Sequence, residues 1–380
     1  MNMETRIDFL RWLSTDMALK ILACLDDAAD LICASAVSRY WKNIVISNEL
    51  TKKLCVERFP ELTSITRVTE PSRNLVPTGV DSATDGKEPV VGEKDHKAYA
   101  SLLCALTSFP QTFLIGDPIS ASSTDRYPQE SILKTIAKDK ILHPKSYWSS
   151  KGSDTTDTPE TLIYRLKDNF CVITEIYLHP FQALFQLNFP IYSSKYIRFR
   201  MGHPKCWNEI DRDFVNAQEC ADDKFIWTYT SKMFPVSQEN RLQRFELPEP
   251  VVCIGGFLQV ELLGRVQKQD ADGKYYICVA RVQAIGRKLS PAFSVEFSQP
   301  SNVVSLKYDV DEFVKIMQSV CSGHSGALNT TQLPVAWGDL QNFMNIVQAH
   351  WDGEEDEWVE EDEFGVDGDD DDEIDPIFII

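Results

Sequence analysis

The residues best suited to bind a metal ion are His203, Cys206 and Cys220, which lie within one short segment. An imidazole and two thiolates are zinc ligands, but their spacing fits no common zinc module and a fourth ligand is not evident. We therefore expect no metal site here, and we interpret the three side chains as buried or satisfied individually.

Other patterns that could support catalysis are also incomplete. The chain has no glycine-rich phosphate-binding loop of either common type. The sequence Gly323-His-Ser-Gly differs from the nucleophile elbow Gly-x-Ser-x-Gly, because its second glycine comes one position too early. The acidic run from Asp367 lacks the glycine and the glutamate that a calcium loop needs. We expect no cofactor and no catalytic residue, and therefore a protein that is not an enzyme.

Charge is distributed unevenly along the 380 residues, whose net charge is −19. Residues 352–380 contain 16 of the 57 acids and no base, which leaves 41 acids against 38 bases over the rest of the chain. Like charges at this density repel, so we expect 352–380 to be a disordered acidic tail. Aromatic residues among its acids favour a second interpretation, a segment that folds onto a basic partner. Because no basic stripe with interleaved aromatics occurs, we expect no nucleic-acid binding.

Cellular location is indicated by what the sequence lacks. No apolar run approaches the ~20 residues that a membrane helix needs, and charges interrupt the first residues where a secretory signal would be apolar. The ten cysteines are scattered, and no two have the C-x-x-C spacing. We read them as reduced thiols of a cytoplasmic and/or nuclear protein that does not contact a membrane.

Helical signals dominate residues 5–62, and they predict a small helical domain. Four short helices are expected near 15–25, 28–34, 36–46 and 49–58. Ser14 or Thr15 can cap the first helix and Asp27 the second. Composition then changes over 63–95, where proline, glycine and polar residues replace the apolar periodicity and predict a flexible linker.

Alternating patterns predict strands over most of 113–289, after a short helix near 97–107. Strands without intervening helices favour an antiparallel, jelly-roll-like β-sandwich, so we expect one domain over 96–295. The segment 270–273 predicts a hairpin turn. Helices expected near 310–320 and 337–351 form a C-terminal region over 296–351. The fold class is therefore multidomain α+β.

The spacing of apolar residues in the N-terminal helices resembles that of an F-box. The block from Val37 to Trp41 and the Ile-Leu pair at residue 21 carry much of the resemblance. Ser14-Thr15 stands where proline is usual and Ser38 where cysteine is common, but Thr15 can still cap the helix. The resemblance implies docking to a Skp-type adaptor, which joins cullin and RING subunits. The adaptor-binding candidates are Leu13, Met17, Ile21, Leu25, Val37 and Trp41.

The later segments 119–132, 147–150, 243–251 and 260–264 resemble a plant F-box subfamily with a discoidin-like or galactose-binding-like β-sandwich. That resemblance implies binding through loops at one end, with substrate-binding candidates Arg126, Tyr127 and Trp148. The alternative for both aromatic residues is that they anchor the sandwich core.

These observations together predict the substrate-recognition subunit of an SCF-type ubiquitin ligase. The helices would dock the adaptor and the sandwich would present an unidentified target protein. The alternative is a lectin-like carbohydrate-binding protein with a degenerate F-box.

Overall fold

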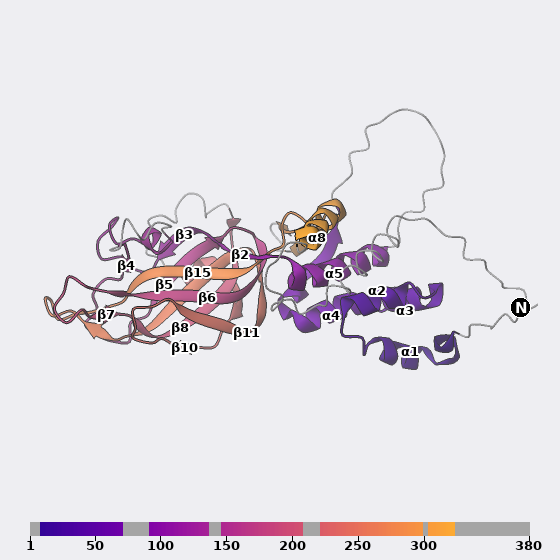
Figure 1. The fold of residues 1–380 in the computed structure, drawn as a ribbon, viewed down its shortest axis with the longest axis horizontal. Helices are drawn as coiled ribbons and strands as arrows, with labels where there is room; N and C mark the ends of the chain where they lie inside the picture. The colour runs from indigo at the N-terminus through magenta and orange to yellow at the C-terminus, as the bar shows by residue number, and fades with distance from the viewer. Residues whose placement is uncertain (1–7, 71–90, 137–145, 208–220, 299–302, 324–380) are drawn as a thin grey trace, which may run out of the picture.

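The computed structural model describes residues 8–70, 91–136, 146–207, 221–298 and 303–323. These residues form an elongated multidomain α+β molecule, with helices at one end and a β-sandwich at the other (Figure 1). The helix predicted over 337–351, the acidic tail and Cys220 lie outside the described residues.

The N-terminal segment forms short helices that begin close to the predicted positions. They are η1 (Phe9–Trp12), α1 (Thr15–Leu22), α2 (Ala28–Ser35), α3 (Arg39–Ser47) and α4 (Leu50–Arg58). The Asp27 carboxylate accepts the backbone N–H of Ala29 and caps α2 as predicted. The prediction for Thr15 is wrong, because Thr15 is the first residue of α1 and Ser14 occupies the cap position without a side-chain hydrogen bond.

Both ends of the predicted linker over 63–95 adopt regular structure, so that prediction is wrong there. The elements are η2 (Pro60–Ser64), β1 (Ile65–Thr69) and α5 (Val91–Ser108). β1 pairs in parallel with β17 (Val303–Tyr308), a partner about 238 residues away in the chain. Pairing at that separation leaves no local sequence signal. Residues 71–90 lie outside the described residues.

The region expected to hold only helices from residue 296 begins with strands. β16 (Phe293–Ser298) pairs with β17 in a three-stranded sheet of order β1-β17-β16. The expected helix near 310–320 is present as α8 (Val310–Gly323). Each of the two strands has only six residues. Strands this short show no long alternating pattern in the sequence, and their pairing within the sheet stabilises them.

The β-sandwich consists of two antiparallel sheets. The first has the order β10-β8-β12-β5-β3, with β9 beside β8. Its strands are β3 (Ile115–Ala121), β5 (Glu160–Leu166), β8 (Ser194–Pro204), β9 (Phe225–Thr230), β10 (Phe234–Pro235) and β12 (Phe257–Arg265). The second has the order β11-β6-β15-β2, with β4 beside β15 and β7 beside β6. Its strands are β2 (Gln111–Phe113), β4 (Trp148–Ser149), β6 (Phe170–Gln182), β7 (Ile191–Tyr192), β11 (Gln243–Ile254) and β15 (Cys278–Lys288).

Two adjacent glycines divide the apolar run over 251–264 between the two sheets. Gly255 and Gly256 have φ of +104° and +74°, a backbone region that favours glycine. A Cβ on Gly255 would lie 2.2 Å from the Cβ of His203. The chain therefore leaves β11 in one sheet and enters β12 in the other. The predicted hairpin over 270–273 is confirmed by the pairing of β13 (Gln267–Lys268) with β14 (Tyr275–Tyr276).

A single hydrophobic cluster joins the helical end to the sandwich. It runs from Ile32 and Cys55 through α5 and α8 to Phe170 and Ile254 of the sandwich. Within this cluster, Cys55 Sγ donates a buried hydrogen bond to the Tyr99 carbonyl at 3.2 Å. Packing at interior density resists relative motion, so the two ends hold a defined orientation.

Candidate functional site

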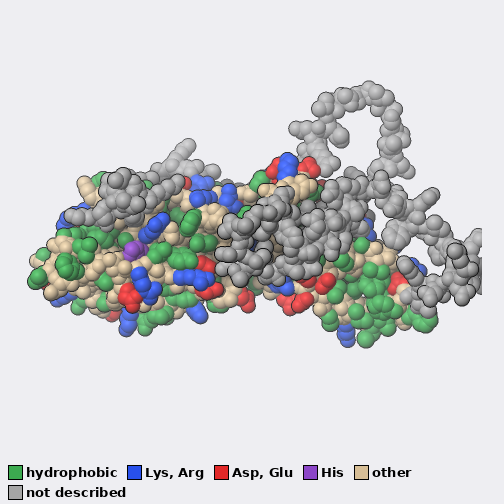
Figure 2. Space-filling view, in the orientation of Figure 1, with side chains coloured by type: hydrophobic (Ala, Val, Ile, Leu, Met, Phe, Trp, Pro, Cys, Tyr) green, Lys and Arg blue, Asp and Glu red, His purple; other side chains and the backbone are tan. Residues whose placement is uncertain are grey.

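Five large apolar side chains are exposed at the helical end of the molecule. Their exposed fractions are 52% for Phe9, 78% for Trp12, 47% for Met17, 39% for Ile21 and 52% for Val37. We call these five residues the docking face. In Figure 2 apolar atoms gather over this end, near α1. Exposed apolar residues that gather in one area are typical of an interaction surface.

The docking face exists because α1 is apolar on two sides. Ala18 and Leu22 lie on one side and are buried in the core of the helical end. Met17 and Ile21 are one helical turn apart and remain exposed. A surface helix of a globular protein normally has one apolar side, so the second side is typical of a helix that packs against another protein.

The six adaptor-binding candidates divide into two groups in the structure. Met17, Ile21 and Val37 belong to the docking face. The other three, Leu13, Leu25 and Trp41, are partly buried and pack against the helical core. These three therefore support the domain as well as adjoining its surface.

Sequence reasoning missed Phe9 and Trp12, which precede the first residue of the recognised pattern. Both residues lie on η1, which begins after Asp8. The Asp8 carboxylate holds this helix in place, because its Oδ1 accepts the Leu10 N–H at 3.2 Å and the Trp41 Nε1–H at 2.8 Å. Oδ2 accepts the Ser38 hydroxyl at 3.2 Å. Ser38 thus connects η1 to α3 at the position where cysteine is common. The sequence signal that could have indicated Phe9 and Trp12 is an aspartate, Asp8, followed by these two aromatic residues.

The three substrate-binding candidates of the sandwich have different environments. Trp148 is fully buried, and its Nε1–H donates to the Ser123 carbonyl at 3.1 Å. A ligand cannot reach it, so that prediction is wrong and the core alternative holds for Trp148. Tyr127 is 61% exposed. The Arg126 side chain is 72% exposed and lies 3.8 Å from the Asp125 carboxylate.

The loop between β6 and β7 exposes four further apolar residues at the end of the sandwich farthest from the helices (Figure 1). They are Leu184, Phe185, Leu187 and Phe189, each more than half exposed. We call them the tip loop. Beside Phe185 is a small pocket, which we call the tip pocket, and Arg126 contributes to its lining. No motif in the sequence pointed to this segment.

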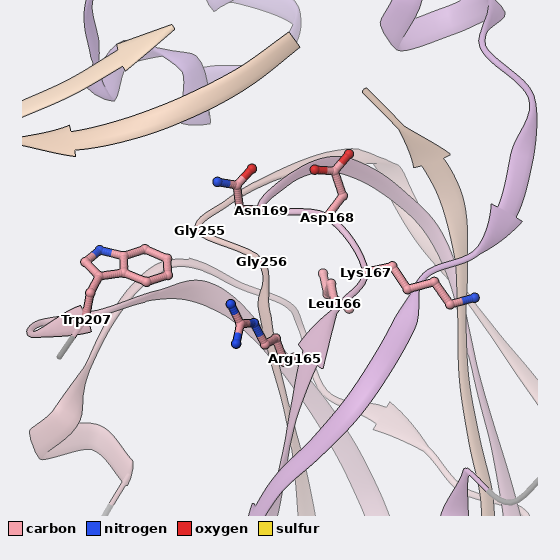
Figure 3. A pocket seen from close by; sticks show the side chains of 8 residues that line it. All are labelled: Arg165, Leu166, Lys167, Asp168, Asn169, Trp207, Gly255 and Gly256. Atoms are coloured by element: carbon pink, nitrogen blue, oxygen red, sulfur yellow. The ribbon is translucent and has the colours of Figure 1, made fainter. Parts of the chain in front are cut away.

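A second cavity, of about 280 Å³, lies between the β5–β6 and β11–β12 turns (Figure 3). The Asp168 carboxylate at its edge accepts the backbone N–H of Ser290 at 2.9 Å. Lys167 Nζ donates to the Phe113 carbonyl at 2.7 Å. Because these charged groups already stabilise the fold, we assign no ligand to this cavity.

No group of three or more histidine, cysteine or acidic side chains in the described part of the chain is arranged to hold a metal ion. His203 is buried, and burial lowers the pKa of its imidazole. Its Nδ1 lies 3.0 Å from the Pro204 carbonyl. Among the described helices, none has both the length and the apolar character for a membrane span.

Solved structures similar to the sandwich have low sequence identity and low structural scores. A family 32 carbohydrate-binding module of Clostridium perfringens NanJ, in complex with galactose, is 12% identical with a TM-score of 0.28, over 47% of this chain and 98% of that one. A fucolectin from striped bass serum is 10% identical with a TM-score of 0.29, over 48% and 50%. Allantoicase from Saccharomyces cerevisiae is 11% identical with a TM-score of 0.31, over 50% and 53%. We draw no functional conclusion from these values.

Sequence comparison identifies the helical end. A family model described as F-box-like matches residues 15–57, which include three of the five docking-face residues. The F-box protein At4g00755 of Arabidopsis thaliana is 41% identical over 354 residues, or 90% of this chain and 93% of the relative. With a relative this similar along almost its whole length, the chain belongs to the F-box proteins.

Proposed function

We propose that the chain is the substrate-recognition subunit of an SCF-type ubiquitin ligase and has no catalytic activity of its own. The docking face binds a Skp-type adaptor, and through it the cullin and RING subunits. The protein acts in the cytoplasm and/or the nucleus. The observation that carries this proposal is the set of five exposed apolar side chains on a domain that the F-box-like family model matches.

The mechanism is an increase in effective concentration. Holding a target protein near a charged ubiquitin-conjugating enzyme makes their encounter intramolecular. The docking face and the tip loop lie at opposite ends of the long axis (Figure 1). Because one hydrophobic cluster joins the two halves, the packed body rather than a flexible linker sets the distance between adaptor and target.

The test is adaptor binding by the full chain with Trp12→Ala and Met17→Asp. Trp12 is the most exposed residue of the docking face, and Met17 is half exposed, so both changes leave the core intact. Buried aromatic anchors dominate interfaces, and we expect the adaptor to bind about 30-fold more weakly or not at all. A pull-down with purified Skp-type adaptor measures the effect.

Met233→Asp is the matched control, because Met233 is 57% exposed and lies on the sandwich. It introduces the same charge into a similar residue far from the docking face, and it should retain the adaptor. Retention of the adaptor by the double variant would contradict the proposal. Thermal unfolding of each variant checks that the helical end remains folded.

The carbohydrate-binding alternative loses one of its three candidate contacts, because Trp148 is buried. Glycan-array binding by the full chain tests it directly. Specific sugar binding that persists in the Trp12→Ala, Met17→Asp variant, together with no adaptor binding by the unaltered chain, would establish the alternative instead.

A further inference from the structure

The tip pocket is surrounded by aromatic rings from several segments of the chain. The Tyr147 and Phe181 rings stack with centroids 3.7 Å apart, and Phe185 lies 6.3 Å beyond Phe181. Tyr192 and Tyr276 form a perpendicular pair at 6.4 Å. Phe181, Tyr192 and Tyr276 are buried, whereas Phe185 is exposed at the rim. The pocket therefore has a rigid aromatic interior and one exposed ring at its edge.

A buried carboxylate also faces this pocket. Glu130 is 9% exposed and lines the pocket, and its Oε1 accepts the Tyr147 hydroxyl at 2.8 Å. Among the described residues, no lysine, arginine or histidine side chain forms an ion pair with Glu130. A carboxylate with this little exposure is costly to bury unless a positive charge compensates it.

Other polar groups around the pocket contribute negative potential. Asp125 also lines it, so its charged lining consists of two acids and one base, Arg126. The Tyr276 hydroxyl donates to the Asp272 carboxylate at 2.6 Å, and burial raises the pKa of that phenol. The Tyr192 hydroxyl donates to Gln186 Oε1 at 2.7 Å. The acids in the lining outnumber the bases, so the pocket favours a positively charged occupant.

The size of the pocket limits its occupant. Its volume is about 70 Å³, which is room for only a few water molecules. Pockets for whole small-molecule ligands occupy about 300 Å³ or more. The tip pocket can therefore receive the charged head of one side chain, but not a complete sugar ring.

We propose that the tip pocket binds the cationic side chain of a lysine or arginine in the target polypeptide, while the tip loop contacts apolar residues beside it. Cations are attracted to ring faces within about 6 Å, and Glu130 supplies the opposite charge. The identification of this polypeptide as a target rests on the proposed function. A protein is favoured over a membrane, because two acids against one base repel anionic lipid headgroups.

A buried ion pair stabilises the loops around the pocket. Arg265 and Glu160 are 1% and 4% exposed in their side chains and form a direct salt bridge. The Arg265 guanidinium also donates to the Lys151 and Tyr275 carbonyls at 2.8 and 3.0 Å, and Glu160 accepts the Ser123 hydroxyl at 2.8 Å. The network connects segments that are adjacent in the chain to the pocket residues Asp125, Ser149 and Tyr276, and it therefore supports the shape of the pocket.

The test measures binding of labelled peptides to the full chain by fluorescence anisotropy. Four peptides share a Gly-Ser frame with a central Phe-Leu-X, where X is lysine, arginine, glutamine or glutamate. We expect the lysine and arginine peptides to bind about tenfold more tightly than the glutamine peptide. Glu130→Gln keeps the acceptor for Tyr147 and should abolish this difference. Asp157→Asn is the control, because Asp157 is an exposed acid outside the pocket.

Two further variants separate the pocket from its surroundings. Phe185→Ala should weaken binding of the lysine peptide several-fold. Leu187→Ala should have a smaller effect on this binding, because Leu187 is 83% exposed and lies outside the pocket. Arg126→Gln should strengthen binding of the lysine peptide, because it removes the base that competes with the peptide lysine for the acids of the pocket. Weaker binding by Arg126→Gln would contradict the proposal.

Equal binding of the lysine and glutamine peptides, or no effect of Glu130→Gln, would overturn the proposal. Binding to phosphatidylserine–phosphatidylcholine vesicles without peptide preference would also overturn it in favour of a membrane. Adaptor binding is measured on the same samples. Loss of the peptide preference with the adaptor retained rejects only the pocket, whereas a retained preference without adaptor binding rejects the proposed function.

Discussion

The two ends of the molecule both expose apolar side chains, but in different chemical settings. The docking face consists of four apolar residues on η1 and α1 and of Val37 in the turn between α2 and α3. The tip combines an apolar loop with an aromatic pocket that contains carboxylates. A face of large apolar side chains suits a partner with a complementary apolar surface, whereas a pocket with more acids than bases selects among side chains. This difference is what the proposed function requires, with a constant partner at one end and discrimination among targets at the other.

The largest expected effect concerns the tip alone. Arg265→Met removes one member of a buried ion pair and leaves Glu160 buried without its cation. Such a loss costs about 3–5 kcal/mol, which urea unfolding of the full chain measures. Adaptor binding at low temperature should persist, because the docking face lies at the other end (Figure 1). A change in unfolding free energy below about 0.5 kcal/mol would show that this network does not stabilise the tip.

A smaller effect concerns the junction between the two ends, where His203 lies 4.7 Å from the Phe297 ring of β16. Burial lowers the pKa of His203, so the unfolded chain binds a proton more readily. Stability contributed by neutral His203 is therefore present above the unfolded pKa of about 6.5 and is lost as pH falls below it, by at most about 1.4 kcal/mol per pH unit.

His203→Asn keeps a donor for the Pro204 carbonyl and removes this titration. We expect its unfolding free energy to fall less steeply than that of the unaltered chain between about pH 6.5 and 5. Urea unfolding at several pH values measures the difference. Identical slopes for the two proteins would mean that the His203 proton does not contribute to the stability of the junction.

The smallest expected effect sharpens the description of the docking face. Ser14 has φ of −62° and Leu13 is extended, so proline fits position 14 without strain. Ser14→Pro should stabilise the chain by about 0.4–1 kcal/mol by restricting the unfolded state. Thermal unfolding measures the gain, and adaptor affinity should not fall. Destabilisation would show that the backbone at the start of α1 differs from the structure described.

The difference between the ends also explains what the sequence could predict. Met17 and Ile21 were expected at the adaptor contact because the F-box resemblance covers both within one short segment, and Phe9 and Trp12 were missed because they precede the residues that carry that resemblance. The tip pocket joins residues between Asp125 and Cys278, and no local pattern indicates that they meet. Likewise, β1 became visible only with its distant partner β17.

The pairing of β1 with β17 has a consequence for synthesis of the chain on the ribosome. The sequence between these strands includes the entire sandwich, and paired residues are about 238 positions apart. At 5–20 residues per second, β1 waits roughly 10 to 50 seconds for its partner. During that interval the helices from α1 to α5 are translated but lack their closing sheet, so the sandwich is complete on the nascent chain before the helical end acquires its final support.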